Sequence, residues 1–385
     1  MAKRLFLERD LSRELERLAQ LYSVVVITGP RQSGKTSLCK HHFSTYEYVN
    51  LENPATREQV LVNPKAFLEQ YATNGLIIDE AQHLPELFSY VQVVVDEDER
   101  AKFVLTGSSN FALLQNITQS LAGRAAVLTL LPFSLNEIDK EVDTDSLIFK
   151  GGYPAVWAKN IPIQDVAQNY YNTYIERDVC QILNIKDLSR FQTFIRLCAG
   201  RIGTEFNASA LSNEIGVSVP TIQEWLSVLE ASYVLFRLPP FFRNIGKRLV
   251  KSPKIYFYDT GLACYLLGIE NEQQLETHPL RGALFENMIV LEFIKKRFNA
   301  GKIPKLYFYR DKSQREVDLI EEKGTALYAY EIKSATTFTK SFVHNLDYFR
   351  KVAGQDVAST QVIYDGEMDV ETPENGMLNF RNLKN

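Results

Sequence analysis

Cysteine and histidine are scarce in this sequence, and their spacing argues against the sites that these residues usually build. Among 385 residues there are four cysteines and five histidines. The cysteines lie far apart and form no C-x-x-C pair, which argues against both a disulfide framework and a zinc site. The histidines show no metal-ligand spacing. We therefore expect buried or inert thiols in a reducing cytoplasm, at Cys39, Cys180, Cys198 and Cys264.

Long apolar runs and a large excess of one charge are also missing. No segment approaches the length of a membrane-spanning helix, and the N-terminal Met-Ala-Lys-Arg has no apolar stretch behind it. We expect no membrane partner and a cytoplasmic location. The net charge is −4, so binding to nucleic acid would need a local basic face. The length and the 45% hydrophobic content are sufficient for two or three globular domains.

One glycine-rich segment, which follows the apolar residues 24–28, organises the rest of the chain. Residues 29–36 fit the pattern G-x-x-x-x-G-K-[ST] of a loop that binds nucleotide phosphates. The two glycines permit backbone angles that side chains forbid, so N–H groups can point at phosphate oxygens. We expect Lys35 to act catalytically on the β- and γ-phosphates and Thr36 to ligate Mg²⁺. The expected cofactor-binding residues here are Gly29, Pro30, Arg31, Gln32, Ser33, Gly34, Lys35, Thr36 and Ser37.

A pair of acids supplies the second half of such a site, and it makes a chance match in a surface loop a weaker alternative. Residues 75–78 are apolar and lead directly into Asp79 and Glu80. Asp79 stands where a Walker B acid would bind the cofactor and hold Mg²⁺. Glu80 is placed to orient and deprotonate the attacking water as a general base. The alternative is a solvated acid pair that caps a helix.

Small polar residues follow a third apolar segment, residues 103–106. Ser108 is the candidate that senses the γ-phosphate, with Ser109 and Asn110 beside it. An ordinary polar turn explains any one of these three equally well.

Apolar and amphipathic segments alternate along this part of the chain, which predicts a parallel sheet covered by helices on both faces. In such a sheet, nucleotide binds at the carboxyl ends of the strands. We expect strands at 24–28, 46–51, 75–80, 103–106 and 126–130, helices at 10–21, 37–42, 64–71, 84–95 and 111–121, and a loop at 52–58.

Several motifs together resemble those of the prokaryotic AAA-type ATPases that carry a C-terminal domain of poorly known function. The resemblance covers nearly the whole chain. Its motifs are residues 29–36, 76–80, Leu-Thr-Gly-Ser-Ser at 105–109, Ser-Leu-Ala-Gly-Arg at 120–124, Tyr-Ile-Glu-Arg-Asp at 174–178, residues 254–262 and Gly-Ala-Leu-Phe-Glu at 282–286.

The resemblance implies an α/β fold class with a P-loop ATPase core and a restriction-endonuclease-like C-terminal domain. We place the ATPase core at residues 1–135 and a helical lid at 136–200. A winged-helix-like module would follow at 201–245, and the nuclease-like α/β domain at 246–385. The helical patterns at 133–137, 165–183 and 188–199 agree with the lid.

Two arginines are candidates for a finger that stabilises the transferred phosphate. Arg124 comes shortly after the sensing strand and could reach a γ-phosphate, either of its own subunit or of a neighbour in a homo-oligomer. Such a finger accelerates hydrolysis by about 10³–10⁵. The alternative is an arginine paired with a carboxylate inside the fold. Arg177 is the second candidate.

The residues after the lid resemble a helix-turn-helix. We expect helices at 210–215 and 219–231, a turn between them and a wing strand at 233–238. The second helix is not basic, which leaves two alternatives open. The module binds DNA, or it serves as a connector. A basic cluster follows, which is either a phosphate-contact patch or a solvated loop, at Arg243, Lys247, Arg248, Lys251 and Lys254.

Three predicted strands and a helix in the C-terminal part carry a second acidic constellation. Asp318 lies in one strand, and Glu331 and Lys333 lie two residues apart on the next, so they share one face. The D…E-x-K spacing resembles the core of the restriction-endonuclease-like nucleases. The resemblance implies that Asp318, Glu331 and the helix residue Glu286 hold Mg²⁺, and that Lys333 activates the attacking water catalytically.

These motifs predict an ATP-binding and ATP-hydrolysing protein with Mg²⁺ as its metal. The nucleotide state would control a nuclease-like domain that acts on nucleic acid, with DNA as the first expectation. The alternative is an ATP-gated regulatory or binding switch in which the nuclease-like domain is a non-catalytic scaffold.

Overall fold

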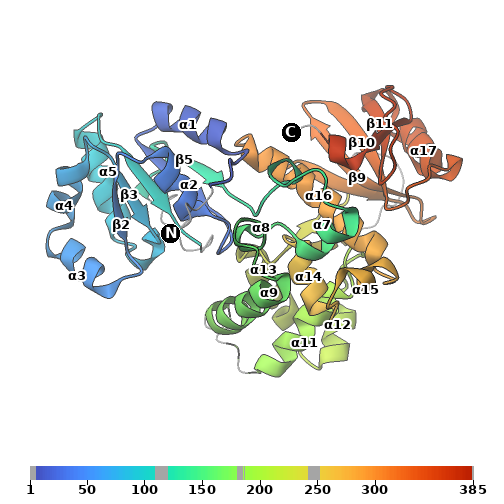
Figure 1. Ribbon diagram of the computed structural model, residues 1–385, viewed down its shortest axis with the longest axis horizontal. Helices are drawn as coiled ribbons and strands as arrows, with labels where there is room; N and C mark the ends of the chain where they lie inside the picture. Colours follow the sequence, from blue (N-terminus) through green and yellow to red (C-terminus); the bar gives the residue numbers. More distant parts are fainter. Residues whose placement is uncertain (1–5, 109–119, 180–184, 186, 242–251, 384–385) are drawn as a thin grey trace.

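The computed structural model describes residues 6–108, 120–179, 185, 187–241 and 252–383, with the side chains of residues 176–179 outside this description. Figure 1 shows an α/β layer at one end, helices in the middle and a second α/β layer at the C-terminal end. The first part has its own buried apolar residues, whereas one apolar cluster runs from the helical middle into the C-terminal sheet, and a further cluster lies within the C-terminal part.

The first part contains a five-stranded parallel sheet of order β2-β3-β4-β1-β5. This order confirms the predicted α/β fold with a parallel sheet. The elements are α1 (Ser12–Leu21), β1 (Val24–Thr28), α2 (Lys35–His42), β2 (Glu47–Asn50), α3 (Pro54–Val62), α4 (Pro64–Tyr71), β3 (Leu76–Asp79), η1 (Ala81–His83), α5 (Leu87–Glu97), β4 (Phe103–Thr106) and β5 (Ala125–Thr129).

Helices cover both faces of this sheet because successive strand residues point to opposite sides. Val24 and Val26 of β1 belong to an apolar cluster with residues of α4 and α5. Val25 and Ile27 belong to the cluster on the other face, with residues of α1 and α2. All five residues of β1 are buried. The loop that follows therefore begins from a strand that is packed on both faces, at the carboxyl edge of the sheet.

The middle part is mostly helical and includes a two-stranded antiparallel sheet of β6 and β7. Because β7 begins at Lys254, the boundary expected between residues 245 and 246 falls inside this small sheet. The elements are η2 (Leu135–Glu137), α7 (Thr144–Lys150), α8 (Pro154–Lys159), α9 (Ile163–Tyr170), the π-helix η3 (Tyr171–Val179), α11 (Leu188–Ala199), α12 (Ala208–Ile215), α13 (Val219–Ala231), β6 (Leu235–Leu238), β7 (Lys254–Phe257), α14 (Thr260–Leu266) and α15 (Glu272–Glu276).

The C-terminal part is a mixed five-stranded sheet of order β12-β11-β10-β9-β8. Strands β8, β9 and β10 are antiparallel, and β10, β11 and β12 are parallel. The elements are α16 (Arg281–Asn299), β8 (Leu306–Arg310), β9 (Glu316–Lys323), β10 (Ala326–Lys333), η4 (Lys340–Val343), α17 (His344–Ala353), η5 (Gly354–Asp356), β11 (Val357–Tyr364), β12 (Gly376–Asn379) and η6 (Phe380–Asn382).

The long helix α16 connects the three parts (Figure 1). Its Glu292 accepts a hydrogen bond from the backbone N–H of Leu135 over 2.9 Å, and its Lys295 donates to the carbonyl of Phe133 over 2.7 Å. On the same helix, Asn287 bonds both the N–H and the carbonyl of Phe257 in β7. The helix therefore contacts the segment after β5, the middle part and the C-terminal sheet.

Two sequence predictions about secondary structure are wrong. Residues 52–58 were expected to form a loop, but α3 begins at Pro54, and the side chain of Asn53 caps it by accepting from Ala55 N–H. The helix expected at 165–183 is divided, because α9 ends at Tyr170 and a π-helix follows. The helix expected at 111–121 lies almost entirely outside the described residues.

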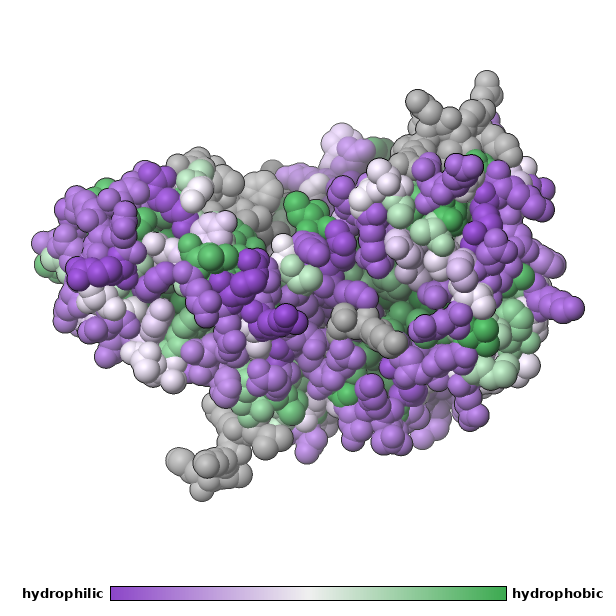
Figure 2. Space-filling model, turned by 90° about the horizontal axis from the view of Figure 1, so that it is seen from above, coloured by the Kyte–Doolittle hydropathy of each residue, from purple (hydrophilic) through white to green (hydrophobic). Residues whose placement is uncertain are grey.

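Among the residues that the structure describes, no helix has the length and apolar character needed to cross a bilayer. The face in Figure 2 is mostly hydrophilic, and its apolar side chains lie in small separate patches.

Candidate functional site

The glycine-rich loop connects β1 to α2 and takes the backbone shape that its two glycines allow. Gly29 has φ 140° and Gly34, which caps α2, has φ 97°. A Cβ on Gly29 would lie 2.1 Å from the carbonyl oxygen of Leu130, so no other residue fits there. Because α2 begins at Lys35, the unpaired N–H groups of its first turn face the loop, which favours an anion.

Lys35 lies inside the loop with its ammonium on backbone carbonyls. Its Nζ donates to the carbonyl oxygens of Gly29 over 3.0 Å and of Pro30 over 2.7 Å. Burial lowers the pKa of Lys35 to about 8, although the carboxylates of Glu80 and Asp79 act in the opposite direction. The nearby carboxylates compensate the charge of this buried ammonium only in part. A phosphate group bound in the loop would supply the remaining negative charge.

The two residues predicted to hold Mg²⁺ at the nucleotide are in direct contact. The Thr36 hydroxyl donates to Oδ2 of Asp79 over 2.9 Å. The same carboxylate accepts from the Tyr48 hydroxyl over 2.7 Å and from the Thr106 hydroxyl. A hydroxyl and a carboxylate oxygen at this separation fit a Mg²⁺ ion, which binds oxygen ligands. Tyr48 and Thr106 were not predicted from the sequence.

Glu80 follows Asp79 in a left-handed conformation with φ 55°, which is rare for a residue with a side chain. Its Oε2 accepts from Nε2 of Gln82 over 2.5 Å and from the hydroxyl of Ser108 over 3.2 Å. The structure therefore brings the expected base together with the expected γ-phosphate sensor. Ser109 and Asn110 lie outside the described residues.

A cleft of about 760 Å³ opens above the loop, within the usual size range of small-molecule sites. Apolar side chains of the N-terminal segment and of α8 form part of its wall, including Phe6, Leu7, Pro154 and Ala155. The polar part of the wall comes from the loop and its surroundings: Arg31, Gln32, Gly34, Lys35, Thr36, Ser37, Glu52 and Glu80. Helices of the middle part thus close over the loop.

Arg9 is a residue of this site that sequence reasoning missed. It is buried, and its guanidinium donates to the carbonyls of Ser33 over 2.8 Å and of Leu131 over 2.7 Å. Its Nε lies 3.1 Å from Glu137, and its guanidinium stacks over the ring of Phe133 at 4.7 Å. Arg9 therefore fastens the loop to the segment after β5. No local motif marks it, because its partners lie far along the chain.

Arg124 lies at the edge of the sheet opposite the loop. It immediately precedes β5, whose Ala125 pairs with Val24 at the start of β1, whereas the loop follows Thr28 at the end of β1. At about 3.3 Å per residue the separation along the strands is about 15 Å, so Arg124 cannot reach the nucleotide of its own chain. Its guanidinium binds both carboxylate oxygens of Asp96, at 2.5 and 2.8 Å.

The second arginine candidate, Arg177, belongs to the π-helix, and its side chain lies outside the described residues. Within the loop itself, Arg31 stacks over the ring of Tyr174 at 5.3 Å. This contact links the loop to the π-helix that contains Arg177.

The C-terminal sheet brings Asp318 of β9 beside Glu331 and Lys333 of β10, as predicted. The Lys333 ammonium lies 2.7 Å from Glu331 and 3.4 Å from Asp318. Asp318 also accepts from the backbone N–H of Ile332 over 2.8 Å. Oε2 of Glu331 is buried and has no hydrogen-bond partner among the described atoms. An unpaired buried carboxylate oxygen of this kind fits a cation at Asp318 and Glu331.

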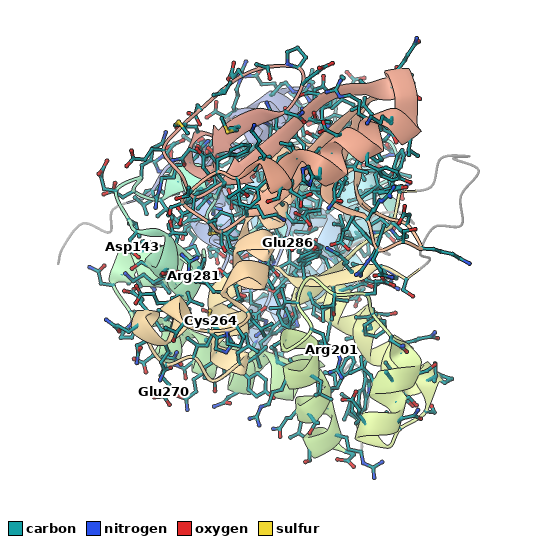
Figure 3. The ribbon with its side chains drawn as sticks, turned by 90° about the vertical axis from the view of Figure 1, so that its right-hand side faces the viewer. Asp143, Arg201, Cys264, Glu270, Arg281 and Glu286 are labelled. Carbon is teal, nitrogen blue, oxygen red and sulfur yellow. The ribbon has the colours of Figure 1, made fainter. Side chains whose placement is uncertain are left out.

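The placement of Glu286 differs from the prediction. Its Oε1 accepts from the Tyr256 hydroxyl over 2.5 Å and from the Lys254 ammonium over 3.0 Å. Figure 3 shows Glu286 on α16, where the helix passes beneath the C-terminal sheet. Within the described part of the chain, no group of three or more His, Cys, Asp or Glu is arranged to hold a metal ion. Glu286 therefore does not complete a three-carboxylate site with Asp318 and Glu331, because Lys254 and Tyr256 already bind it.

Burial and neighbouring charges shift the ionisation of these groups. Burial, together with the nearby Asp318 carboxylate, raises the pKa of Glu331 to about 8. Burial also raises the pKa of Glu286, against the effect of Lys254. Burial alone would lower the pKa of Lys333, but Asp318 and Glu331 outweigh it and raise that pKa. The cluster therefore carries less negative charge than it would if all of its carboxyl groups were ionised.

The predicted basic cluster is also corrected at the one residue that is described. Lys254 is 1% exposed, so it is neither a solvated residue nor a phosphate contact. Arg243, Lys247, Arg248 and Lys251 lie outside the described residues. The two helices expected at 210–215 and 219–231 are present as α12 and α13, with Gly216 at φ 75° after the first and the Asn207 and Ser218 side chains capping the two helices.

Comparison with known proteins agrees with this arrangement. Residues 22–139 match a family model described as an AAA domain. Residues 141–273 and 281–383 match two models described as domains of unknown function, DUF8612 and DUF4143. The fold and the phosphate loop thus define an AAA-type protein with a P-loop ATPase fold, and such a fold implies nucleotide binding.

The chain belongs to the same family as two uncharacterized mycobacterial proteins. It is 33% identical over 341 residues to the uncharacterized protein Rv2008c of Mycobacterium tuberculosis and to a counterpart in Mycobacterium bovis, covering 86% of this chain and 74% of each relative. It is 22% identical over 360 residues to an uncharacterized protein of Methanocaldococcus jannaschii, covering 84% of this chain and 78% of that protein.

Among solved structures, a Walker-type ATPase of Pyrococcus abyssi is similar to 68% of this chain, and the match covers 96% of that chain. The sequence identity is 16% and the TM-score is 0.46.

Proposed function

We propose that this protein binds and hydrolyses ATP with Mg²⁺ at the phosphate loop. The contact between the Thr36 hydroxyl and the Asp79 carboxylate, at 2.9 Å beside Lys35, carries the proposal. Lys35 would bind the β- and γ-phosphates, and Thr36 and Asp79 would hold the metal ion. Bound Mg²⁺ neutralises charge on the phosphate oxygens. Glu80 would accept the proton of the attacking water, and Ser108 would hold Glu80 and contact the γ-phosphate.

The walls of the cleft support a nucleotide as the ligand. Phosphates would lie against the polar loop, while the apolar wall from Phe6, Leu7 and α8 suits a flat base. Because Pro154 and Ala155 of α8 belong to this wall, a bound nucleotide would join the first part to the helical middle. Nucleotide state would then alter how these two parts pack.

ATP binding and hydrolysis by variants test this proposal. Lys35→Ala is expected to lose ATP binding, and Glu80→Gln is expected to bind ATP and hydrolyse it slowly. Lys65→Ala is a matched control, because Lys65 pairs with Glu97 on the surface, far along the chain from the loop. Tight ATP binding by Lys35→Ala would contradict the phosphate-loop assignment.

We further propose that nucleotide state controls the C-terminal nuclease-like domain, which acts on or binds nucleic acid, with DNA as the first substrate to test. Support comes from the mixed sheet and from Lys333, whose ammonium contacts both Asp318 and Glu331. Lys333 would orient the attacking water toward a phosphodiester. A cation at Asp318 and Glu331 would act as a Lewis acid.

Cleavage assays with Mg²⁺ or Mn²⁺, with and without ATP, test this second step. We expect wild-type protein to cut plasmid or single-stranded DNA, and both Asp318→Ala and Lys333→Ala to lose cleavage while ATP hydrolysis continues. RNA provides the parallel substrate. Equal cleavage by Asp318→Ala would overturn the assignment of the nuclease site.

A second candidate function is an ATP-gated switch whose nuclease-like domain is a non-catalytic scaffold. The observation that favours it is the pairing of each carboxylate with a lysine or a backbone N–H, which gives the cluster a structural role. Absence of cleavage under every condition, together with binding of a partner that depends on ATP, would select this function.

A further inference from the structure

Lys254 is a buried cation at the point where three segments of the chain meet. It is the first residue of β7, and its side chain is 1% exposed. Its ammonium lies 3.0 Å from Oε1 of Glu286 on α16 and 2.5 Å from Oε1 of Glu316 on β9. The ring of Phe308 lies 5.5 Å from the ammonium. The middle part of the chain thus supplies the positive charge, and the C-terminal part supplies both negative charges.

The two ends of the carboxylate cluster differ in how completely they are satisfied. At the Glu286 end, Lys254 and Tyr256 both bind the carboxylate, and Arg310 adds a second positive charge 3.2 Å from Glu316. At the other end, Oε2 of Glu331 has no hydrogen-bond partner among the described atoms, although Glu331 is only 5% exposed. Lys333 at this end is 32% exposed, so this end reaches solvent.

A divalent ion near Glu286 would have to displace or approach a buried ammonium. Like charges at such short range repel strongly where water is excluded. An ammonium that has lost its water and both carboxylate partners would be left buried and unpaired, which is strongly unfavourable. Glu286 and Glu316 therefore already have a permanent, buried cation. Asp318 and Glu331 are paired with Lys333, whose side chain is 32% exposed, so its ammonium can move into solvent when a divalent ion binds.

We propose that Lys254 is the resident cation of this cluster, so that the cluster accepts at most one divalent ion, held by Asp318 and Glu331 without Glu286. This inference deepens the proposed nuclease-like site and rests on its assignment to the C-terminal domain. It concerns the binding of a cation in the absence of nucleic acid, so it does not require cleavage.

Mn²⁺ binding to the full-length protein, measured by electron paramagnetic resonance without nucleotide, tests the proposal. Asp318→Asn is expected to remove the C-terminal Mn²⁺ site, and Glu286→Gln is expected to leave its affinity within twofold of wild type. Lys254→Met, which frees Glu286 and Glu316, should bind Mn²⁺ at least tenfold more tightly or bind one ion more. Lys305→Met is the matched control, because Lys305 pairs with Glu322 at an exposed position. Asp79→Asn identifies any contribution from the phosphate loop.

Two results would overturn the proposal. One is Mn²⁺ binding by Lys254→Met that equals wild-type binding in affinity and number. The other is loss of wild-type Mn²⁺ binding in Glu286→Gln, which stands as a test even if Lys254→Met fails to fold. Failure of the nuclease proposal has a different signature, because it would appear as absent DNA cleavage with the Mn²⁺ pattern unchanged.

Discussion

The hydroxyl groups of Thr28 and Tyr233 lie 3.0 Å apart in the protein interior. Thr28 is the last residue before the phosphate loop, and Tyr233 lies between α13 and β6 in the middle part of the chain. The strand that leads into the loop is therefore bonded to the middle part of the chain.

Removing the Tyr233 hydroxyl should weaken the contact between the first part and the middle part. Tyr233→Phe is expected to lower the free energy of unfolding by about 1 kcal/mol, the usual net value of a buried hydrogen bond. Thr28 retains contacts with Thr129 and with the carbonyl of Leu128, so the loss should stay near this value. Urea unfolding followed by circular dichroism measures it, and Tyr90→Phe on the surface is the control. Equal shifts in the two variants would show that the pair contributes nothing.

ATP affinity should fall as pH rises through about 8, because burial lowers the pKa of Lys35 to about 8 in the free protein. Bound phosphates favour the ammonium form and raise this pKa in the complex. Binding is therefore strongest below pH 8, and it weakens above pH 8 by up to about tenfold per pH unit. Titrations at pH 7, 8 and 9 measure the effect, and Lys35→Arg, which stays charged, should flatten it. A constant dissociation constant in wild type over this range would refute the prediction.

Gly29→Ala should disrupt the loop. A Cβ would meet the Leu130 carbonyl oxygen at 2.1 Å, and the φ of 140° is strained for any side chain. We expect a loss of at least about 2 kcal/mol in the free energy of unfolding, together with loss of ATP binding. Gly123→Ala is the control, because it shares a positive φ but a Cβ there meets no atom within 4 Å. A stable Gly29→Ala variant that binds ATP normally would contradict the described loop geometry.

We expect Arg124 to act on the nucleotide of another chain, because it lies too far from the loop of its own chain. Hydrolysis per chain should then rise with protein concentration, and Arg124→Ala should lower it by up to about 10³–10⁵ while ATP still binds. A mixture of Arg124→Ala with Glu80→Gln should regain activity, because each chain supplies what the other lacks. Arg100→Ala, which removes a surface pair with Asp98, is the control. Wild-type activity in Arg124→Ala would reduce its role to pairing with Asp96.

Local sequence patterns predicted the elements that depend on neighbouring residues. The bounds of β1, β4 and α4 agree with their apolar runs and, for α4, with Pro64 at its start. α3 was missed because its polar residues resemble a loop, although the pair Asn53 and Pro54 is itself a helix-start signal. The glycines, Lys35 and Thr36 were predictable because a phosphate loop needs them at fixed spacing.

Residues whose partners are remote in sequence could not be predicted. Arg9 contacts Leu131, which lies 122 residues away, and Tyr48 contacts Asp79 across two adjacent strands. Lys254 was grouped with its basic neighbours in sequence, yet tertiary packing buries it against Glu286. The spacing D…E-x-K identified Asp318, Glu331 and Lys333 correctly as neighbours. It contained no information about which cation Glu286 would meet.

Helix α16 contacts Phe133 through Lys295 and Lys254 through Glu286. These two helix residues are nine positions apart, which corresponds to about 13 Å along the axis at 1.5 Å per residue. A tilt of about 10° about one contact displaces the other by roughly 2 Å, enough to break a hydrogen bond of ordinary length. A small change in the tilt of α16 at Phe133 would therefore decide whether Glu286 can still reach the ammonium of Lys254.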